Sequence, residues 1–219
     1  MKLHLEISHI YKHYDGRVVL ADCTFFFKDS GSYAIMGPNG SGKSTLFRLC
    51  ALLEHPDKGE INYWADDVII GKDLQLRRRV TLVLPRIGVF NTSVFKNVAY
   101  GLRIRGMERE EIFKKVERSL NFVGLMHKRN QNALTLSSGE TQRLGIARAI
   151  VIEPEIIFFD EPTAFVDEEN KKIVEGIILK IRGDGKSTIV MTTHDRALAE
   201  RLADQTLLMQ NGRLFPGEP

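Results

Sequence analysis

The segment that most constrains how this chain can fold is Gly37-Pro38-Asn39-Gly40-Ser41-Gly42-Lys43-Ser44. It matches the phosphate-loop pattern G-x-x-x-x-G-K-[ST] in full, and it lies between the apolar run Ser32–Met36 and a helical pattern. Glycines let backbone N–H groups turn toward phosphate oxygens, and a helix start adds partial positive charge. In such loops the lysine reaches the β- and γ-phosphates and the serine hydroxyl ligates Mg²⁺. The sequence therefore predicts a strand–loop–helix unit that binds a nucleoside triphosphate through Gly37, Pro38, Asn39, Gly40, Ser41, Gly42, Lys43, Ser44 and Thr45.

Apolar periodicity along the rest of the chain indicates strands that alternate with helices. Strand-like runs cover Leu3–Ile10, Val18–Phe27, Ser32–Met36, Val80–Leu84, Ile156–Asp160, Ser187–Thr192 and Gln205–Met209. Helical patterns follow Gly42 and cover Arg109–Val123, Ser137–Ile152, Glu168–Arg182 and Asp195–Leu202. We expect an α/β fold with a mostly parallel sheet, an antiparallel β edge and an inserted helical subdomain. The expected core is 1–84 and 155–219, and the expected helical subdomain is 85–154.

Composition narrows the possible partners and compartments. The 31 basic and 28 acidic residues leave a net charge of +3, a surplus too small to imply a nucleic-acid partner. No uncharged apolar run approaches the roughly 20 residues that cross a bilayer. Cys23 and Cys50 have neither a disulfide pattern nor metal-ligand spacing. These features favour the cytosol.

Two carboxylates end the apolar run Ile156–Asp160. A buried strand has little reason to end in Asp160 and Glu161 unless a cation or a water molecule is held there. Asp160 is suited to hold Mg²⁺ and Glu161 to polarise an attacking water. His194 follows a further apolar strand, and ligands collect at the carboxyl ends of strands in open α/β sheets. We therefore expect His194 to contact the γ-phosphate.

The chain resembles the nucleotide-binding subunit of ATP-binding-cassette (ABC) transporters over essentially all its length. Leu136-Ser137-Ser138-Gly139-Glu140 resembles the family signature LSGGQ, and a helical pattern follows it. Asp160-Glu161-Pro162-Thr163 resembles the Walker B end, and Ala164-Phe165-Val166-Asp167 the D-loop. His194 resembles the switch histidine, and Tyr14 matches the aromatic residue that stacks on adenine.

This resemblance implies a P-loop NTPase core and a mechanism. Two copies of the chain would sandwich two ATP molecules with Mg²⁺, and Ser137, Ser138, Gly139 and Glu140 of one copy would complete the site of the other. Hydrolysis would drive separate transmembrane permease subunits from the cytoplasmic face of the membrane, with an extracytoplasmic solute-binding protein as a further partner. A separate cassette suits an importer, and Asn91–Gly106 is similar to cassettes of tungstate or molybdate importers.

The sequence departs from the family pattern at several positions. Pro85 stands where the family has the Q-loop glutamine, and proline offers neither a side-chain hydrogen bond nor an N–H. We expect impaired or rerouted hydrolysis or coupling there. Ser138 replaces a glycine, and Glu140 adds a negative charge, so we expect a weakened but usable sandwich. In the D-loop, Phe165 and Val166 are unusual, while Asp167 is kept.

Other function classes stay open at this point. A soluble ABC ATPase that acts in translation or DNA repair would share these motifs, although such relatives usually carry two cassettes or a long coiled-coil insertion. A phosphate-loop kinase or GTPase outside this family would leave the signature and His194 unexplained, and the chain has no Asn-Lys-x-Asp base-reading motif.

Overall fold

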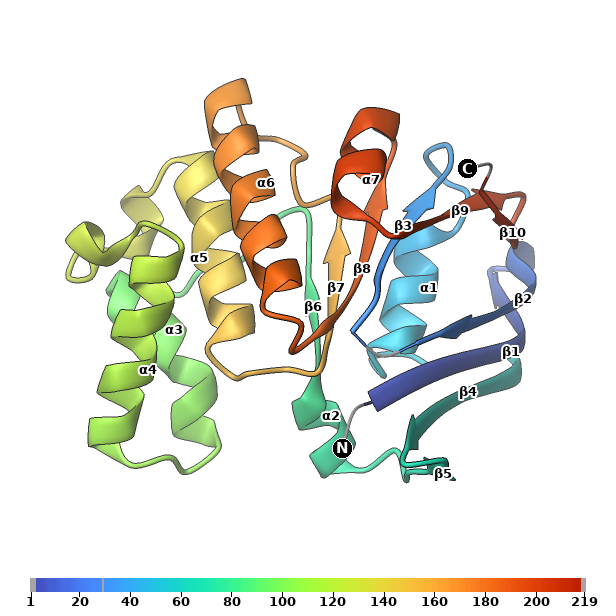
Figure 1. Ribbon diagram of the computed structural model, residues 1–219, viewed down its shortest axis with the longest axis horizontal. Coiled ribbons are helices and arrows are strands. Elements are labelled where there is room, and N and C mark those ends of the chain that lie inside the picture. The colour runs from blue at the N-terminus through green and yellow to red at the C-terminus, as the bar shows by residue number, and fades with distance from the viewer. Residues whose placement is uncertain (1–2, 29, 218–219) are drawn as a thin grey trace. The chain divides into compact units, whose positions relative to one another are not determined.

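Strand β3 (Ser32–Met36) leads into the phosphate loop and helix α1 (Lys43–Cys50) follows it, as the sequence predicts. Figure 1 shows this strand, loop and helix in a computed structural model that describes residues 3–28 and 30–217. Contacts among the described residues divide the chain into two compact units. The first unit is Met1–Leu82, Glu155–Glu161 and Lys180–Pro219, and the second is Val83–Pro154 and Pro162–Leu179. Residues 162–179, expected with the core, thus cluster with the helical segment.

The main sheet of the first unit has the strand order β10-β9-β3-β8-β7-β6 (Figure 1). β3 pairs in parallel with β8 and β9, and β7 pairs in parallel with β8. The register sets Met36 opposite Thr193 and Asp160 opposite Thr192, so the carboxyl ends of these strands meet at one edge of the sheet. The strands are β6 (Val80–Val83), β7 (Ile156–Asp160), β8 (Thr188–Thr193), β9 (Gln205–Gln210) and β10 (Arg213–Pro216).

The antiparallel edge forms a separate sheet in the order β2-β1-β4-β5. β1 (Leu3–Tyr14) extends past the predicted end at Ile10, and it pairs with both β2 (Arg17–Phe27) and β4 (Lys58–Ala65). β4 is absent from the predicted strands because its first residues are polar. The alternation of buried Ile61, Tyr63 and Ala65 is the signal that could have revealed it. The short elements β5 (Val68–Ile69) and α2 (Leu74–Arg79) follow.

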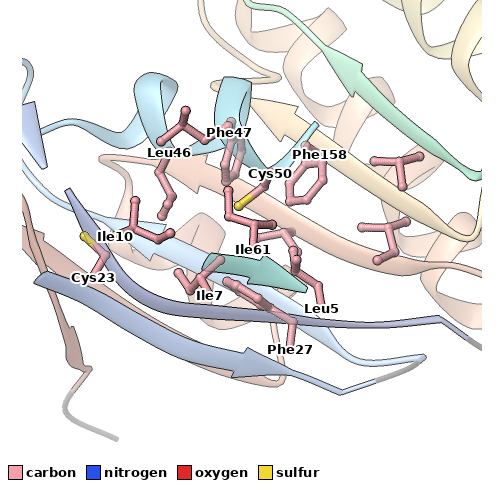
Figure 2. Packing of buried hydrophobic residues seen from close by; sticks show 14 of the residues in the cluster. Leu5, Ile7, Ile10, Cys23, Phe27, Leu46, Phe47, Cys50, Ile61 and Phe158 are labelled. Atoms are coloured by element: carbon pink, nitrogen blue, oxygen red, sulfur yellow. The ribbon is translucent and has the colours of Figure 1, made fainter. Parts of the chain in front are cut away.

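The core of the first unit lies between α1 and this antiparallel sheet. Figure 2 shows Leu46, Phe47 and Cys50 of α1 on the side that faces Ile7 and Ile61 of the sheet. The Phe47 ring also packs on Phe158 of β7, with 5.1 Å between ring centroids. Burial of these side chains holds α1, and with it the phosphate loop, against both sheets.

The second unit is helical, built from α3 (Val94–Ile104), α4 (Arg109–Phe122), α5 (Ser138–Ile150) and the first turns of α6 (Glu168–Gly183). The helices α3, α4 and α5 all contact one another. Short 3₁₀ turns, η1 (Met126–Lys128) and η2 (Ala133–Thr135), lead into α5, and α7 (Arg196–Leu202) belongs to the first unit. The α/β class is confirmed. Within the residues that the structure describes, no helix is both long enough and apolar enough to span a bilayer.

Candidate nucleotide site

The phosphate loop adopts a backbone that requires its glycines. Gly37 has φ +150° and Gly42 has φ +106°, both in the region that favours glycine. A Cβ on Gly37 would lie 2.1 Å from the backbone oxygen of Met209, so β9 leaves no room for a side chain there. The Lys43 ammonium is buried and donates to the carbonyl oxygens of Gly37 and Pro38 at 2.8 and 3.0 Å. The loop and lysine therefore form one rigid turn.

A pocket of about 200 Å³ opens over this turn. Its walls come from β2, the phosphate loop, the start of α1 and the residue after β7: Val19, Asn39, Gly40, Gly42, Lys43, Ser44, Thr45 and Glu161. The described part of the chain offers no hydrogen-bond partner to the buried Ser41 Oγ or to Glu161 Oε1. Because buried polar atoms are normally paired, these two atoms indicate a polar ligand.

The carboxyl ends of β7 and β8 bring the predicted acidic pair and histidine together. The hydroxyl of Thr192 donates to Asp160 Oδ1 at 2.7 Å and accepts from the Glu161 backbone N–H at 2.9 Å. His194 Nδ1 lies 3.1 Å from Glu161 Oε2, and its ring is 71% exposed. Glu161 has φ +46°, a strained conformation for a non-glycine residue.

Thr192 is a further residue of this edge, and no motif in the sequence predicts it. It is fully buried on β8, and its hydroxyl fixes the carboxylate of Asp160 and the backbone of Glu161 at once. The available signal was a pair of threonines, Thr192 and Thr193, directly after the apolar residues of this strand. Sequence alone does not show which of the two faces the acids, because that depends on the register of β8 against β7.

The aromatic residue expected to stack on adenine ends β1 in the same unit. Tyr14 is half-buried, and its hydroxyl donates to Glu54 in the loop after α1. The ring is therefore held against the chain that follows the phosphate loop rather than left free on the strand end.

The signature segment forms the start of α5 in the second unit. Ser137 is the N-cap residue, its Oγ accepts from the Glu140 N–H at 3.3 Å, and Glu140 Oε2 accepts from the Ser137 N–H at 3.0 Å. Lys128 Nζ lies 2.5 Å from Glu140 Oε1. Burial alone would raise the pKa of Glu140, but the bonds from Lys128 and Ser137 outweigh it and lower that pKa. The extra negative charge noted in the sequence is thus paired within the unit. Ser138 is exposed.

Gly139 is buried against the start of α6. A Cβ on Gly139 would lie 2.1 Å from Cγ and 2.5 Å from Cβ of Asn170. Asn170 is held in turn by Asp167, since its side-chain amide donates to both carboxylate oxygens at 3.1 and 3.0 Å. The D-loop aspartate and the signature glycine are therefore joined through Asn170, a residue that no sequence motif singled out.

Pro85 lies at the start of a loop that contacts other residues of the second unit. The Arg86 guanidinium stacks on the Phe165 ring at 4.7 Å, and Phe165 has φ +63°. Arg148 donates to the Gly88 carbonyl at 2.6 Å and lies 5.2 Å from the centre of the Phe90 ring. Proline supplies no hydrogen-bonding side chain, and these polar and cation–π contacts of the loop come from the residues after it.

A phosphate loop between β3 and α1, with carboxylates at the carboxyl end of β7 in the same sheet, defines a P-loop nucleoside triphosphate-binding protein. A family model described as "ABC transporter" matches residues 20–164. The chain belongs to the ABC transporter family, and it is an ATP-hydrolysing subunit of the transport class.

Individual relatives cover nearly the whole chain. The tungstate uptake system ATP-binding protein TupC of Peptoclostridium acidaminophilum is 32% identical over 97% of this chain and 97% of its own length. The phosphate import ATP-binding protein PstB 2 of Natronomonas pharaonis is 34% identical over 98% of this chain and 80% of its own. Among solved structures, CbiO1 of Clostridium perfringens, part of the transporter complex CbiONQ, superposes with a TM-score of 0.85 at 28% identity. That superposition covers 96% of this chain and 86% of CbiO1.

Proposed function

We propose that this chain hydrolyses Mg²⁺-ATP at the phosphate-loop pocket to power the import of an oxyanion such as tungstate. The observation that supports ATP hydrolysis is the pocket itself, because Lys43, Ser44 and Glu161 all line it. The import of an oxyanion is supported by the tungstate relative, which matches the chain from end to end.

The roles proposed for the residues follow from their chemistry. The Lys43 ammonium and the backbone N–H groups of residues 39–45 bind the phosphates. Ser44 and Asp160 would hold Mg²⁺, and the donor set fits because both carry the oxygen ligands that this ion prefers. The ion would supply positive charge that offsets the charge developing on the phosphate oxygens. The Ser41 Oγ, which has no hydrogen-bond partner among the described residues, supports a polar ligand at the phosphate loop.

Glu161 is the proposed general base. Its backbone is fixed by Thr192 and its Oε2 faces His194 Nδ1 at 3.1 Å, so the carboxylate is oriented before a water molecule is engaged. The His194 ring, which is exposed, is the proposed contact of the γ-phosphate. Thr192 acts through Asp160 and Glu161 as a positioning residue.

A second copy of the chain would complete the site. Ser137 and the Gly139 N–H stand at the first turn of α5, where free backbone donors favour a γ-phosphate. Asp167 would face the partner copy at the same interface. Ion pairing of Glu140 with Lys128 removes the repulsion that a free carboxylate would cause there.

The membrane partner is proposed to be a pair of separate transmembrane permease subunits at the cytoplasmic face, with an extracytoplasmic solute-binding protein. A groove of about 740 Å³ between α3 and α4 supports a docking helix, since its lining combines apolar side chains with two arginines and one glutamate. The lining residues are Phe95, Arg103, Met107, Arg109, Glu110, Ile112 and Phe113.

Steady-state ATPase activity with Mg²⁺ tests the proposed hydrolysis. We expect Glu161→Gln to lower turnover by about a hundredfold or more while ATP still binds, because the general base is lost. Pro85→Gln should raise turnover, since glutamine restores a side-chain donor and acceptor. Glu60→Gln, an exposed change on β4, is the matched control and should leave turnover unchanged.

For each variant, one outcome of the ATPase assay would contradict the proposal. Full activity of Glu161→Gln would remove Glu161 as the base. An unchanged rate for Pro85→Gln would remove the idea that Pro85 limits the cycle. If the wild-type chain failed to bind ATP at all, the proposed function would be wrong as a whole.

A further inference from the structure

The end of β1 is joined to the loop after α1 by contacts from consecutive residues. Lys12 Nζ donates to the His55 carbonyl at 2.8 Å and lies 3.2 Å from Asp57 Oδ1. The His13 N–H donates to Asp57 Oδ2 at 2.6 Å, and the Tyr14 hydroxyl donates to Glu54. The strand end that carries the Tyr14 ring is therefore fixed by the loop 54–57, residue by residue.

Glu54 is fixed in turn by α1. Arg48 Nε donates to Glu54 Oε1 at 2.6 Å. The same guanidinium donates through Nη2 to the Thr45 hydroxyl at 3.1 Å and reaches the Tyr14 oxygen at 3.5 Å. Thr45 lines the phosphate pocket. One arginine thus connects the pocket wall with the aromatic ring through side-chain hydrogen bonds.

The charges in this cluster support one another. Burial alone would raise the pKa of Glu54, but the bonds from Tyr14 and Arg48, together with the Arg48 and Lys12 charges, outweigh it and lower that pKa. Glu54 is therefore an anion that accepts from Tyr14 on one oxygen and from Arg48 on the other. A charged acceptor makes both bonds stronger than neutral ones.

One face of the Tyr14 ring is already occupied. The Lys12 ammonium lies 5.4 Å from the ring centroid, within the range of a cation–π interaction, and its side chain is only 15% exposed. Lys12 is held on this face by His55 and Asp57. A planar ligand can therefore stack only on the opposite face.

We infer that Glu54 and Arg48 are positioning residues for the nucleotide base. They fix the Tyr14 ring at a set place relative to Thr45, so that a base stacks on the ring while its phosphates occupy the loop. The inference rests on the proposed ATP binding and adds the residues that hold the base. Because the cluster acts on the ring, it contributes to the affinity for nucleotides and not to the affinity for a bare triphosphate.

Isothermal titration calorimetry tests this inference. The protein is titrated with ATP and, separately, with inorganic tripolyphosphate, both in the presence of Mg²⁺. We expect Glu54→Ala to raise the Kd for ATP about fivefold and to leave the Kd for tripolyphosphate unchanged. A fivefold change corresponds to the typical net contribution of about one hydrogen bond. Tyr14→Phe keeps the ring and removes only the hydroxyl, so it should show the same selective loss. Glu60→Ala is the matched control and should bind both ligands as the wild type does.

The ratio of the two dissociation constants separates the outcomes. Equal weakening of ATP and tripolyphosphate would show that the cluster supports the phosphate loop alone and would overturn the inference. Unchanged ATP binding in both Glu54→Ala and Tyr14→Phe would overturn it as well. If the wild type bound tripolyphosphate but showed no preference for ATP, the base platform would be absent although the phosphate loop works. Failure of the wild type to bind either ligand would instead overturn the proposed function.

Discussion

At Gly139, packing within the unit and the proposed contact with a phosphate both restrict the residue type. The proposed role of the signature needs a backbone N–H that is free to meet a phosphate. The structure adds a requirement inside the same unit, because the Asn170 side chain occupies the space of a Cβ. Ser138, one position earlier, is exposed and carries a side chain without conflict. This contrast accounts for a signature that tolerates serine at one position and keeps glycine at the next.

Gly139→Ala tests this packing. The new methyl group would meet Asn170 Cβ as well as the amide end, and Asp167 holds that amide, so relaxation is costly. We expect a loss of about 1–3 kcal/mol in the free energy of unfolding, measured in urea. Ser138→Ala serves as the control and should change stability little. Asn170→Ala combined with Gly139→Ala should recover part of the loss. If the double variant were as unstable as the sum of the single ones, the two residues would not be coupled.

At the scale of elements, Asp204 connects β3 with α6 in the first unit. It accepts from the backbone N–H and hydroxyl of Ser32 at the start of β3, at 2.9 and 3.0 Å, and pairs with Arg182 at the end of α6. Burial alone would raise the pKa of Asp204, but these donors outweigh it and lower that pKa. A carboxyl with a lowered folded pKa stabilises the fold above its unfolded pKa of about 3.9 and loses that contribution as the pH falls.

The pH dependence of Asp204→Asn follows from this sign. At pH 7 the variant should unfold at a lower urea concentration than the wild type, because the ionised carboxylate no longer accepts from Ser32 and Arg182. The difference should shrink as the pH falls below about 4 and the wild-type carboxyl is protonated. A difference that stays constant from pH 7 to pH 3 would contradict the assignment of this contribution to Asp204.

The elements that the sequence predicted are those whose own residues carry a periodic pattern. β3, α1 and β7 have the predicted bounds or begin where predicted, since an apolar run or a glycine marks each boundary. β4 was missed because polar residues fill its first half, and its place beside β1 is set by pairing with a strand far away in the chain. Thr192, Lys128 and Asn170 were missed for the same physical reason. Thr192 and Lys128 bond to partners on other elements, and Asn170 meets Gly139 of another helix, so only the fold brings these residues together.

At the scale of the whole molecule, the two halves of the proposed reaction belong to different units of the chain. Lys43 and Glu161 line one pocket of the first unit, while Ser137 and Gly139 begin a helix of the second. If the signature acts on the phosphate held by another copy, ATP contributes to association because it binds across two chains. Hydrolysis then removes the group that joins them.

Light scattering of Glu161→Gln tests this association. Without nucleotide we expect the mass of one chain, 24.8 kDa, and with Mg²⁺-ATP twice that value, because the variant binds ATP without consuming it. Lys43→Ala in the same background removes the phosphate contact and should stay at the mass of one chain. ADP should also leave one chain, since it lacks the γ-phosphate that Ser137 would bind. An unchanged mass with ATP, in a sample shown by titration to bind it, would mean that the signature does not act across chains in the isolated protein. Completion of the site would then depend on the membrane subunits, which hold two copies close enough that weak association suffices.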